Sequence, residues 1–150
     1  MELNLSLGLL LVLLLVLAAE FVNGWTDAPN SIATVVSTRV LPPGVALGMA
    51  TLFNVIGAMS GTAVAATIGK GIVRPEVINL TTVGAAMVGI VCWSTFTYYR
   101  GGLPTSESHA LIAGLTGAAL ATAGPSALLW IGWKKVLMGL AFSTFLGFGG

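Results

Sequence analysis

Long apolar runs fill most of the sequence and constrain its fold more than any other feature. Five of them follow one another along the chain: Leu3 to Val22, Gly44 to Gly69, Val77 to Tyr99, Ala110 to Trp133, and Val136 to Gly150. A helix needs roughly 20 mainly apolar residues to cross a bilayer. We therefore expect an all-α, multi-pass protein of the cell membrane, with about five transmembrane helices in one domain.

The scarcity of charge excludes several other classes of protein. Hydrophobic residues make up 56% of the 150 positions and charged residues only 7%, whereas a soluble domain carries about a quarter charged residues. A disordered chain needs low hydrophobicity, which this composition does not have. A net charge of +1 provides no basic stripe for nucleic acid. A water-soluble globule, a disordered chain and a nucleic-acid binder are all excluded.

Two polar segments interrupt the apolar runs, and the first extends from Asn23 to Ser31. Its Asp27 lies between stretches suited to hydrocarbon, where ionisable groups are costly and usually mark an ion or substrate path. We expect the chain to break here. The run Ile32 to Leu41 is then a half-helix or re-entrant segment, since as a helix it covers only half a bilayer. Ordinary capping is the alternative, with Thr26 or Asp27 as N-cap and Pro29 in the first turn.

Polar side chains beyond this segment extend the candidate path. Asn30 and Thr34 are four residues apart and share one side of a helix. Asn54 is a polar residue within the second apolar run. Its side chain either bonds across helices or faces a solute.

The second polar segment, Arg100 to His109, breaks the third run with glycines and a proline and then places hydroxyls at the start of a new helix. A helix N-terminus attracts anions, because its N–H groups are free and the helix dipole is positive there. Thr105, Ser106 and Ser108 add neutral donors, and Glu107 and His109 stand beside them. Capping explains part of this pattern, with Thr105 or Ser106 as N-cap and Glu107 in the first turn.

The two segments together indicate coupled binding of an anion and a cation. Hydroxyl and backbone donors suit a tetrahedral oxyanion, but carboxylates such as Asp27 and Glu107 repel it unless a cation or proton binds as well. Broken helices that point their ends at a central site are a recurring arrangement in secondary transporters. An intramembrane hydrolase is disfavoured, because Ser108 and His109 are adjacent and their side chains diverge on a helix.

At these residues the sequence resembles a known family. Asn23 to Ser31 is similar to the Gly-Ala-Asn-Asp-x-x-Asn signature of the inorganic phosphate transporter (PiT) family, with Thr26 in place of the usual Asn before the Asp. Gly101 to Leu111 is similar to that family's Gly-Leu-Pro-x-Ser-x-x-His-Ala-Leu element, with Glu107 where a hydroxyl residue is often found. The two motifs occur in the family's order, and the resemblance extends over essentially the whole chain.

The resemblance implies one half of an inverted-repeat transporter that moves inorganic phosphate together with Na⁺ or H⁺. It implies phosphate binding by four residues: Asn30, Thr105, Ser106 and Ser108. Asp27 and Glu107 are the implied cation-coupling residues, although Glu107 alternatively carries a proton or only caps its helix. The accessory candidates are Thr26, Ser31, Thr34, His109 and Asn54. No resident cofactor or structural metal is expected, but phosphate taken up as a complex with a divalent metal is an alternative.

The sequence thus predicts a truncated N-terminal repeat. Either a second half, which is missing here, or a second copy of the chain would complete the transporter. Its expected partners are phosphate, the coupling cation and the lipid bilayer. Two rival functions remain: transport of another oxyanion such as sulfate, and a non-transporting membrane scaffold subunit. No enzymatic activity is expected.

Overall fold

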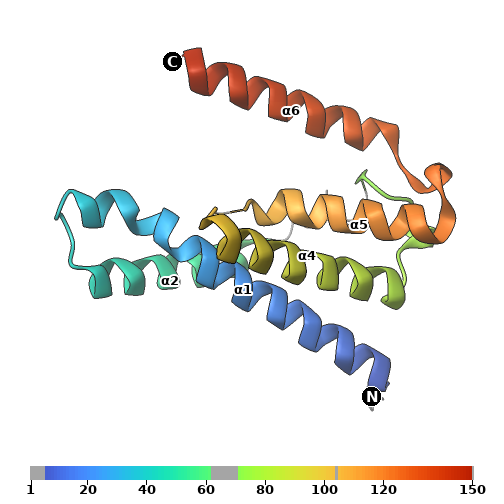
Figure 1. Cartoon of the computed structure of the whole chain (residues 1–150), viewed down its shortest axis with the longest axis horizontal. Helices are drawn as coiled ribbons and strands as arrows, with labels where there is room; N and C mark the ends of the chain where they lie inside the picture. Colours follow the sequence, from blue (N-terminus) through green and yellow to red (C-terminus); the bar gives the residue numbers. More distant parts are fainter. Residues whose placement is uncertain (1–5, 62–70, 104, 150) are drawn as a thin grey trace.

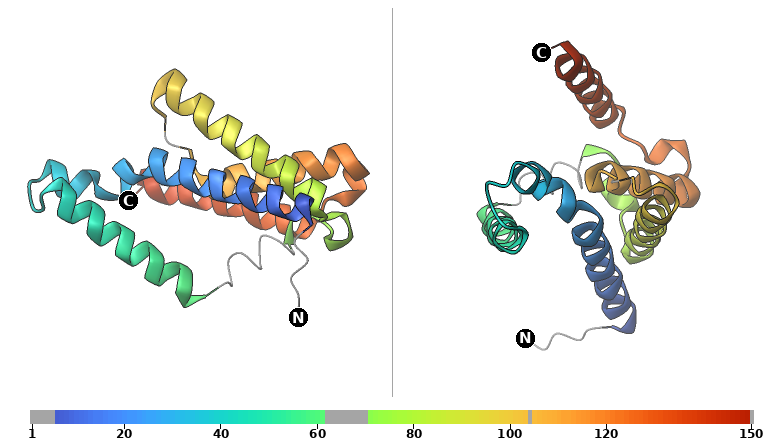
Figure 2. Two further views of the ribbon diagram at one scale, coloured as in Figure 1. Left: turned by 90° about the horizontal axis from the view of Figure 1, so that it is seen from below. Right: turned by 60° about the vertical axis from the view of Figure 1, so that its left-hand side comes forward.

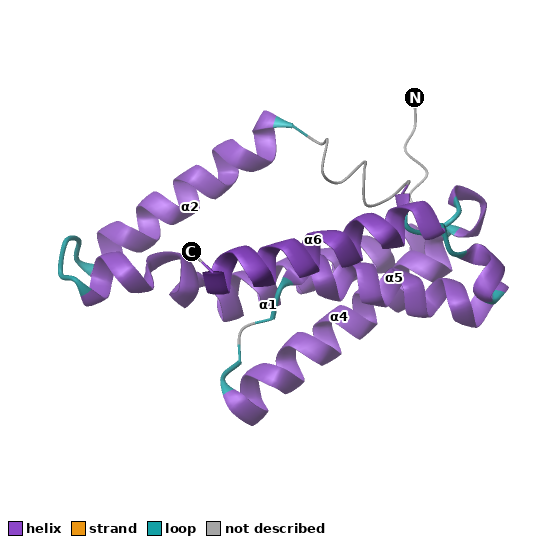
Figure 3. Cartoon of the chain, turned by 90° about the horizontal axis from the view of Figure 1, so that it is seen from above, coloured by secondary structure: helices purple, strands orange, loops and turns teal. Residues whose placement is uncertain are grey.

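The structure, a computed structural model, describes residues 6–61, 71–103 and 105–149. In these residues five α-helices follow one another: α1 (Leu7–Ser37), α2 (Pro43–Ser60), α4 (Leu80–Gly101), α5 (Glu107–Ala123) and α6 (Trp130–Gly149). Two short 3₁₀ turns, η1 (Pro75–Val77) and η2 (Pro125–Ala127), precede α4 and α6. Among the described residues there is no β-strand (Figure 3), so the all-α prediction is confirmed.

The helices form an open arrangement rather than a closed bundle. α4 and α5 pack as an antiparallel pair, and α1 crosses α4 (Figure 1). α2 folds back along the second half of α1, and α6 diverges from the rest (Figure 2). Large apolar side chains cover the outer faces, among them Leu52 at 58% exposure and Phe142 at 63%. Such a surface suits lipid rather than water.

Three of the described helices, α1, α2 and α4, are long and apolar enough to cross a membrane. The expected second span, Gly44 to Gly69, corresponds to α2 up to Ser60, and residues 62–69 lie outside the described part of the chain. The beginning of the first expected span, before residue 6, lies outside it as well.

The first polar segment does not break the chain, contrary to the expectation from the sequence. α1 continues through it as one helix of 31 residues that includes Pro29. The polar side chains bond to their own helix instead of opening it: the Thr26 hydroxyl donates to the Val22 carbonyl at 3.0 Å, and the Ser31 hydroxyl donates to the Ala28 carbonyl at 2.9 Å. Pro29 lacks an N–H and bends a helix without having to end it, and the ribbon of α1 changes direction along its length (Figure 1).

The capping alternative for the first segment is therefore wrong as well, because Thr26 and Asp27 lie inside α1. The predicted half-helix Ile32 to Leu41 is the end of α1, which stops at Ser37. Beyond it Arg39 has a φ of 58°, the left-handed conformation of a tight turn. Pro43 then starts α2 at the position where a helix tolerates proline best.

The expected span Ala110 to Trp133 is likewise divided in two. α5 ends at Ala123, since Gly124 adopts a φ of 70° and Pro125 cannot continue the helix. α6 starts at Trp130, earlier than the predicted Val136. Between the two helices Leu129 N–H donates to the Ile72 carbonyl at 2.9 Å, and Arg74 N–H donates to the Ala127 carbonyl at 2.8 Å.

Small residues allow α4 and α5 to approach closely. Ala86 of α4 and Ala119 of α5 are fully buried, in a core that also contains Ile112 and Leu115. A Cβ atom added to Gly114 would lie 3.0 Å from the Ala86 carbonyl oxygen. Close contact of this kind is how membrane helices associate, because lipid leaves no hydrophobic driving force between them.

Gly114→Val is expected to lower the free energy of unfolding by about 1–3 kcal/mol, the usual cost of overpacking. Gly117→Val is the matched control, since a Cβ at Gly117 meets nothing within 4 Å. The measurement is the thermal unfolding midpoint of both variants in detergent. Equal midpoints for the two variants would contradict the close approach of α4 and α5.

Candidate functional site

Three side chains of the first polar segment share one face of α1, near the middle of that helix. Asn23, Asp27 and Asn30 are spaced by four and three residues, which places their side chains on the same side. The Asn30 amide donates to an Asp27 carboxylate oxygen at 3.3 Å. The face therefore presents one carboxylate that is already oriented by a neighbouring amide.

This face of α1 borders a groove against α2, which we call the α1–α2 groove. Its volume is about 600 Å³. The polar residues that line it are Asn23, Asp27, Asn30, Ser31, Thr51 and Asn54. Asn54 was predicted either to bond across helices or to face a solute, and the structure places it at this groove. Amide, hydroxyl and carboxylate oxygens thus meet at one surface.

The second polar segment lies at a separate site, which we call the α4–α5 hollow. This hollow is about 520 Å³ in volume, and its polar lining consists of Thr105, Ser106 and His109. The Ser106 side chain accepts from His109 N–H at 3.5 Å and is the N-cap of α5, as the sequence allowed. The Thr105 hydroxyl donates to the hydroxyl of the buried Ser94 at 3.3 Å. The start of α5 is therefore fixed to α4.

A hydrogen bond joins the two polar segments. The Asn23 side-chain amide donates to a Glu107 carboxylate oxygen at 2.5 Å, although the two residues are 84 positions apart. Glu107 is the first residue of α5 and its side chain is only partly exposed. The carboxyl group of Glu20, one turn before Asn23 on α1, lies next to that of Glu107. The two polar segments therefore meet where α1 passes the start of α5.

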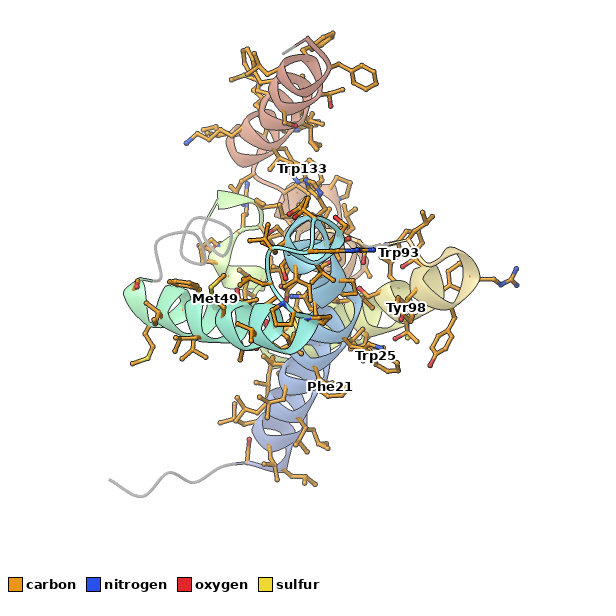
Figure 4. The ribbon with its side chains drawn as sticks, turned by 90° about the vertical axis from the view of Figure 1, so that its left-hand side faces the viewer. Phe21, Trp25, Met49, Trp93, Tyr98 and Trp133 are labelled. Atoms are coloured by element: carbon orange, nitrogen blue, oxygen red, sulfur yellow. The ribbon has the colours of Figure 1, made fainter. Side chains whose placement is uncertain are left out.

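Aromatic side chains of α1 and α4 pack together beside this contact. The Trp25 ring lies 5.9 Å from that of Tyr98 and 6.4 Å from that of Tyr99, measured between centroids. Figure 4 shows Trp25 beside Tyr98, with Phe21 one turn away on α1. The end of α4 that leads into the second polar segment thus packs against the middle of α1, not against one of its ends.

The structure brings most of the predicted site residues to these two places, with four exceptions. Glu107 bonds to Asn23 but lines neither the groove nor the hollow. Thr26 is buried and bonded to its own helix. Thr34 and Ser108 are exposed, and neither lines the groove or the hollow. Asp27 and Asn30 share the groove, whereas Thr105 and Ser106 lie at the hollow with His109.

Three residues that line or contact the two sites were not among the sequence-predicted candidates: Asn23, Thr51 and Ser94. Thr51 lies three residues before Asn54, so the spacing along α2 could have revealed it. Ser94 is a hydroxyl residue in an apolar run, which is a weaker signal. The contact between Asn23 and Glu107 has no signal in the sequence, because it depends on how α1 crosses the α4–α5 pair.

The charges at the two sites limit what they can bind. Neither lining includes a lysine or an arginine among the described residues. No group of three or more His, Cys, Asp or Glu side chains is close enough to hold a metal ion in the part of the chain that the structure describes. The sites offer neutral hydrogen-bond donors for an anion and carboxylates for a cation.

Comparison with known proteins is consistent with this chemistry. The sequence profile of the phosphate transporter family matches residues 23–150, which include both polar segments. A probable low-affinity inorganic phosphate transporter of Streptomyces halstedii is 47% identical over 98% of this chain and 68% of its own length. That of Rhizobium meliloti is 43% identical over 99% of the chain and 45% of its own length. No solved structure matches the chain significantly.

A more distant relative, the low-affinity inorganic phosphate transporter PitA of Escherichia coli, is 36% identical over 82% of this chain and 26% of its own length. The chain thus spans between about a quarter and two thirds of these three relatives. The resemblance seen in the two motifs is confirmed along nearly the whole chain. This membrane protein belongs to the phosphate transporter family.

Proposed function

We propose that the protein transports inorganic phosphate across the cell membrane by secondary active transport, coupled to Na⁺ or H⁺. The observation that carries this proposal is the bond between Asn23, which lines the carboxylate-bearing groove, and Glu107, which directly follows Ser106 of the hollow. A path that bears both kinds of group suits an anion that moves together with a cation. The names of the relatives support phosphate as that anion.

The residue roles follow from the charges of the two sites. Ser106 donates a hydrogen bond to phosphate, and Thr105 does so once its single O–H turns away from Ser94. Asn30 donates from the α1–α2 groove. Without a lysine or arginine in either lining, the negative charge of phosphate is unbalanced until a cation arrives. Asp27 and Glu107 bind that cation, and their carboxylates otherwise repel the anion. Ser108 extends the hydroxyl series beyond the hollow.

The transport path also needs a second set of groups. Asn30, Ser106 and His109 are exposed in this chain, so a further surface has to separate bound phosphate from its surroundings. An inverted second repeat, or a second copy of the chain, provides this surface. The greater length of the relatives supports the second repeat. Exposure of one face at a time then gives alternating access.

Asp27→Asn is expected to abolish cation-dependent phosphate uptake, because the amide keeps the shape of the side chain but loses its charge. Uptake of labelled phosphate into cells, with and without a Na⁺ or H⁺ gradient, measures this effect. Glu76→Gln is the matched control, since Glu76 is an exposed carboxylate in η1 outside both sites. Uptake by Asp27→Asn at the level of the control would remove Asp27 from the mechanism.

Thr105→Val is expected to raise the KM for phosphate roughly two- to tenfold, the loss of about one neutral hydrogen bond. Thr122→Val, on the exposed side of α5, removes a hydroxyl that bonds only to its own helix and should leave the KM unchanged. Phosphate uptake over a range of substrate concentrations measures both values. An unchanged KM in Thr105→Val would exclude this hydroxyl from phosphate binding.

Excess sulfate is expected to leave the uptake of labelled phosphate unchanged, whereas unlabelled phosphate suppresses it. The sites hold the substrate through neutral donors together with carboxylates, and protonated phosphate can donate to a carboxylate whereas sulfate cannot. Equal suppression by both anions would point to a general oxyanion transporter.

The same uptake assay tests two further alternatives. Loss of uptake on chelation of divalent metal would show that phosphate enters as a metal complex. Absence of any uptake would favour a scaffold role.

A further inference from the structure

The side chain of Asn23 connects the two polar segments, and it takes none of the binding roles proposed above. Asn23 directly precedes Gly24, the first residue that matches the signature of the first motif. It is half-buried, it lines the α1–α2 groove beside Asp27, and its amide donates to Glu107. It therefore contacts one candidate cation-binding carboxylate, that of Glu107, and shares the groove with the other, that of Asp27.

The partner of Asn23 is placed where its orientation affects the phosphate site. Glu107 follows the N-cap Ser106 directly, and Thr105 precedes that cap. A glutamate side chain has three rotatable bonds and loses its orientation when it has no partner. Since Glu107 opens the first turn of α5, the bond from Asn23 fixes that turn, and the hydroxyls beside it, relative to α1.

An amide suits this position better than a charged or an apolar side chain does. The carboxyl group of Glu20 already lies next to Glu107, so a third carboxylate would add repulsion. An apolar side chain would leave the partly buried Glu107 carboxylate without its donor. Asparagine has two N–H donors and one carbonyl acceptor, so it can bond to Glu107 in its ionised form and, after rotation of the amide, in its protonated form.

We propose that Asn23 is a positioning residue that makes phosphate binding at the α4–α5 hollow depend on the cation bound in the α1–α2 groove. This inference rests on the proposed function. When Asp27 holds a cation, Asn23 stays directed toward Glu107 and the first turn of α5 keeps its hydroxyls in place. Without the bond, the hydroxyls still bind phosphate, but the cation no longer sets their arrangement.

The test measures phosphate uptake by the complete protein encoded by its gene, at several Na⁺ and H⁺ concentrations. Asn23→Leu is expected to raise the KM for phosphate roughly tenfold, the loss of one hydrogen bond to a charged group, and to remove the dependence of that KM on the cation. The maximal rate should not change, because no phosphate-binding group is lost. Asn23→Gln retains the amide and should restore the cation dependence.

The control is Ser37→Ala on the same helix, whose hydroxyl bonds only to the Thr34 carbonyl. It should behave as the wild-type protein does. A KM for Asn23→Leu that keeps the wild-type cation dependence would overturn the proposal. So would a loss of protein yield or thermal stability with no change in the KM, since this would indicate a purely structural residue.

A double-mutant cycle separates this inference from the proposed function. Asn23→Leu removes the donor and Glu107→Leu the acceptor of one bond, so their combined shift in unfolding temperature should be smaller than the sum of the two single shifts. This readout does not need transport. Coupled shifts without any phosphate uptake would contradict the proposed function alone, whereas additive shifts in a protein that transports phosphate would contradict the role of Asn23.

Discussion

The arrangement of this protein depends on α1 remaining helical through its polar segment. In lipid, each backbone N–H and C=O group needs a partner within the protein, so an unbroken helix is the least costly path for a chain that carries Asp27. The hydroxyls of Thr26 and Ser31 bond to their own helix and keep that path intact. The remaining polar side chains then project from one rigid face. α2 and the start of α5 can both reach that face, which is why the two motifs meet.

The proposed phosphate site has to hold an anion without a basic side chain, which is a second constraint. A lysine or arginine would bind phosphate strongly in a medium of low dielectric constant, and release on the other side would then be slow. Neutral donors bind more weakly, and in the proposed function the Asp27 carboxylate makes phosphate binding conditional on a cation. The composition of the two linings thus favours a carrier, which has to release its substrate, over a storage site.

The sequence was sufficient to predict the fold class, because long apolar runs with so few charges between them are typical of membrane helices. Its two polar motifs were sufficient to predict the family and most of the polar residues at the two sites. It was misleading about the first polar segment: Pro29 and the hydroxyls indicated a break, but in apolar surroundings the same hydroxyls bond back to the helix. It placed the start of α5 well, since Ser106 and Glu107 form a local capping pattern. The contact between Asn23 and Glu107 could not be predicted, because it joins residues 84 positions apart through the crossing of two helices.

The position along α1 at which the α4–α5 pair contacts it determines how deep in the membrane the two sites lie. A helix of 31 residues is about 46 Å long, which exceeds the hydrocarbon thickness of about 30 Å. Asn23 and Trp25 lie close to the centre of α1, so a membrane centred on α1 would have them far from both of its surfaces. Their partners Glu107 and Tyr98 flank the turn between α4 and α5. Polar groups at such depth are tolerated where protein or a water-filled cavity surrounds them. The α1–α2 groove and the α4–α5 hollow, on the two sides of the contact between Asn23 and Glu107, provide such surroundings.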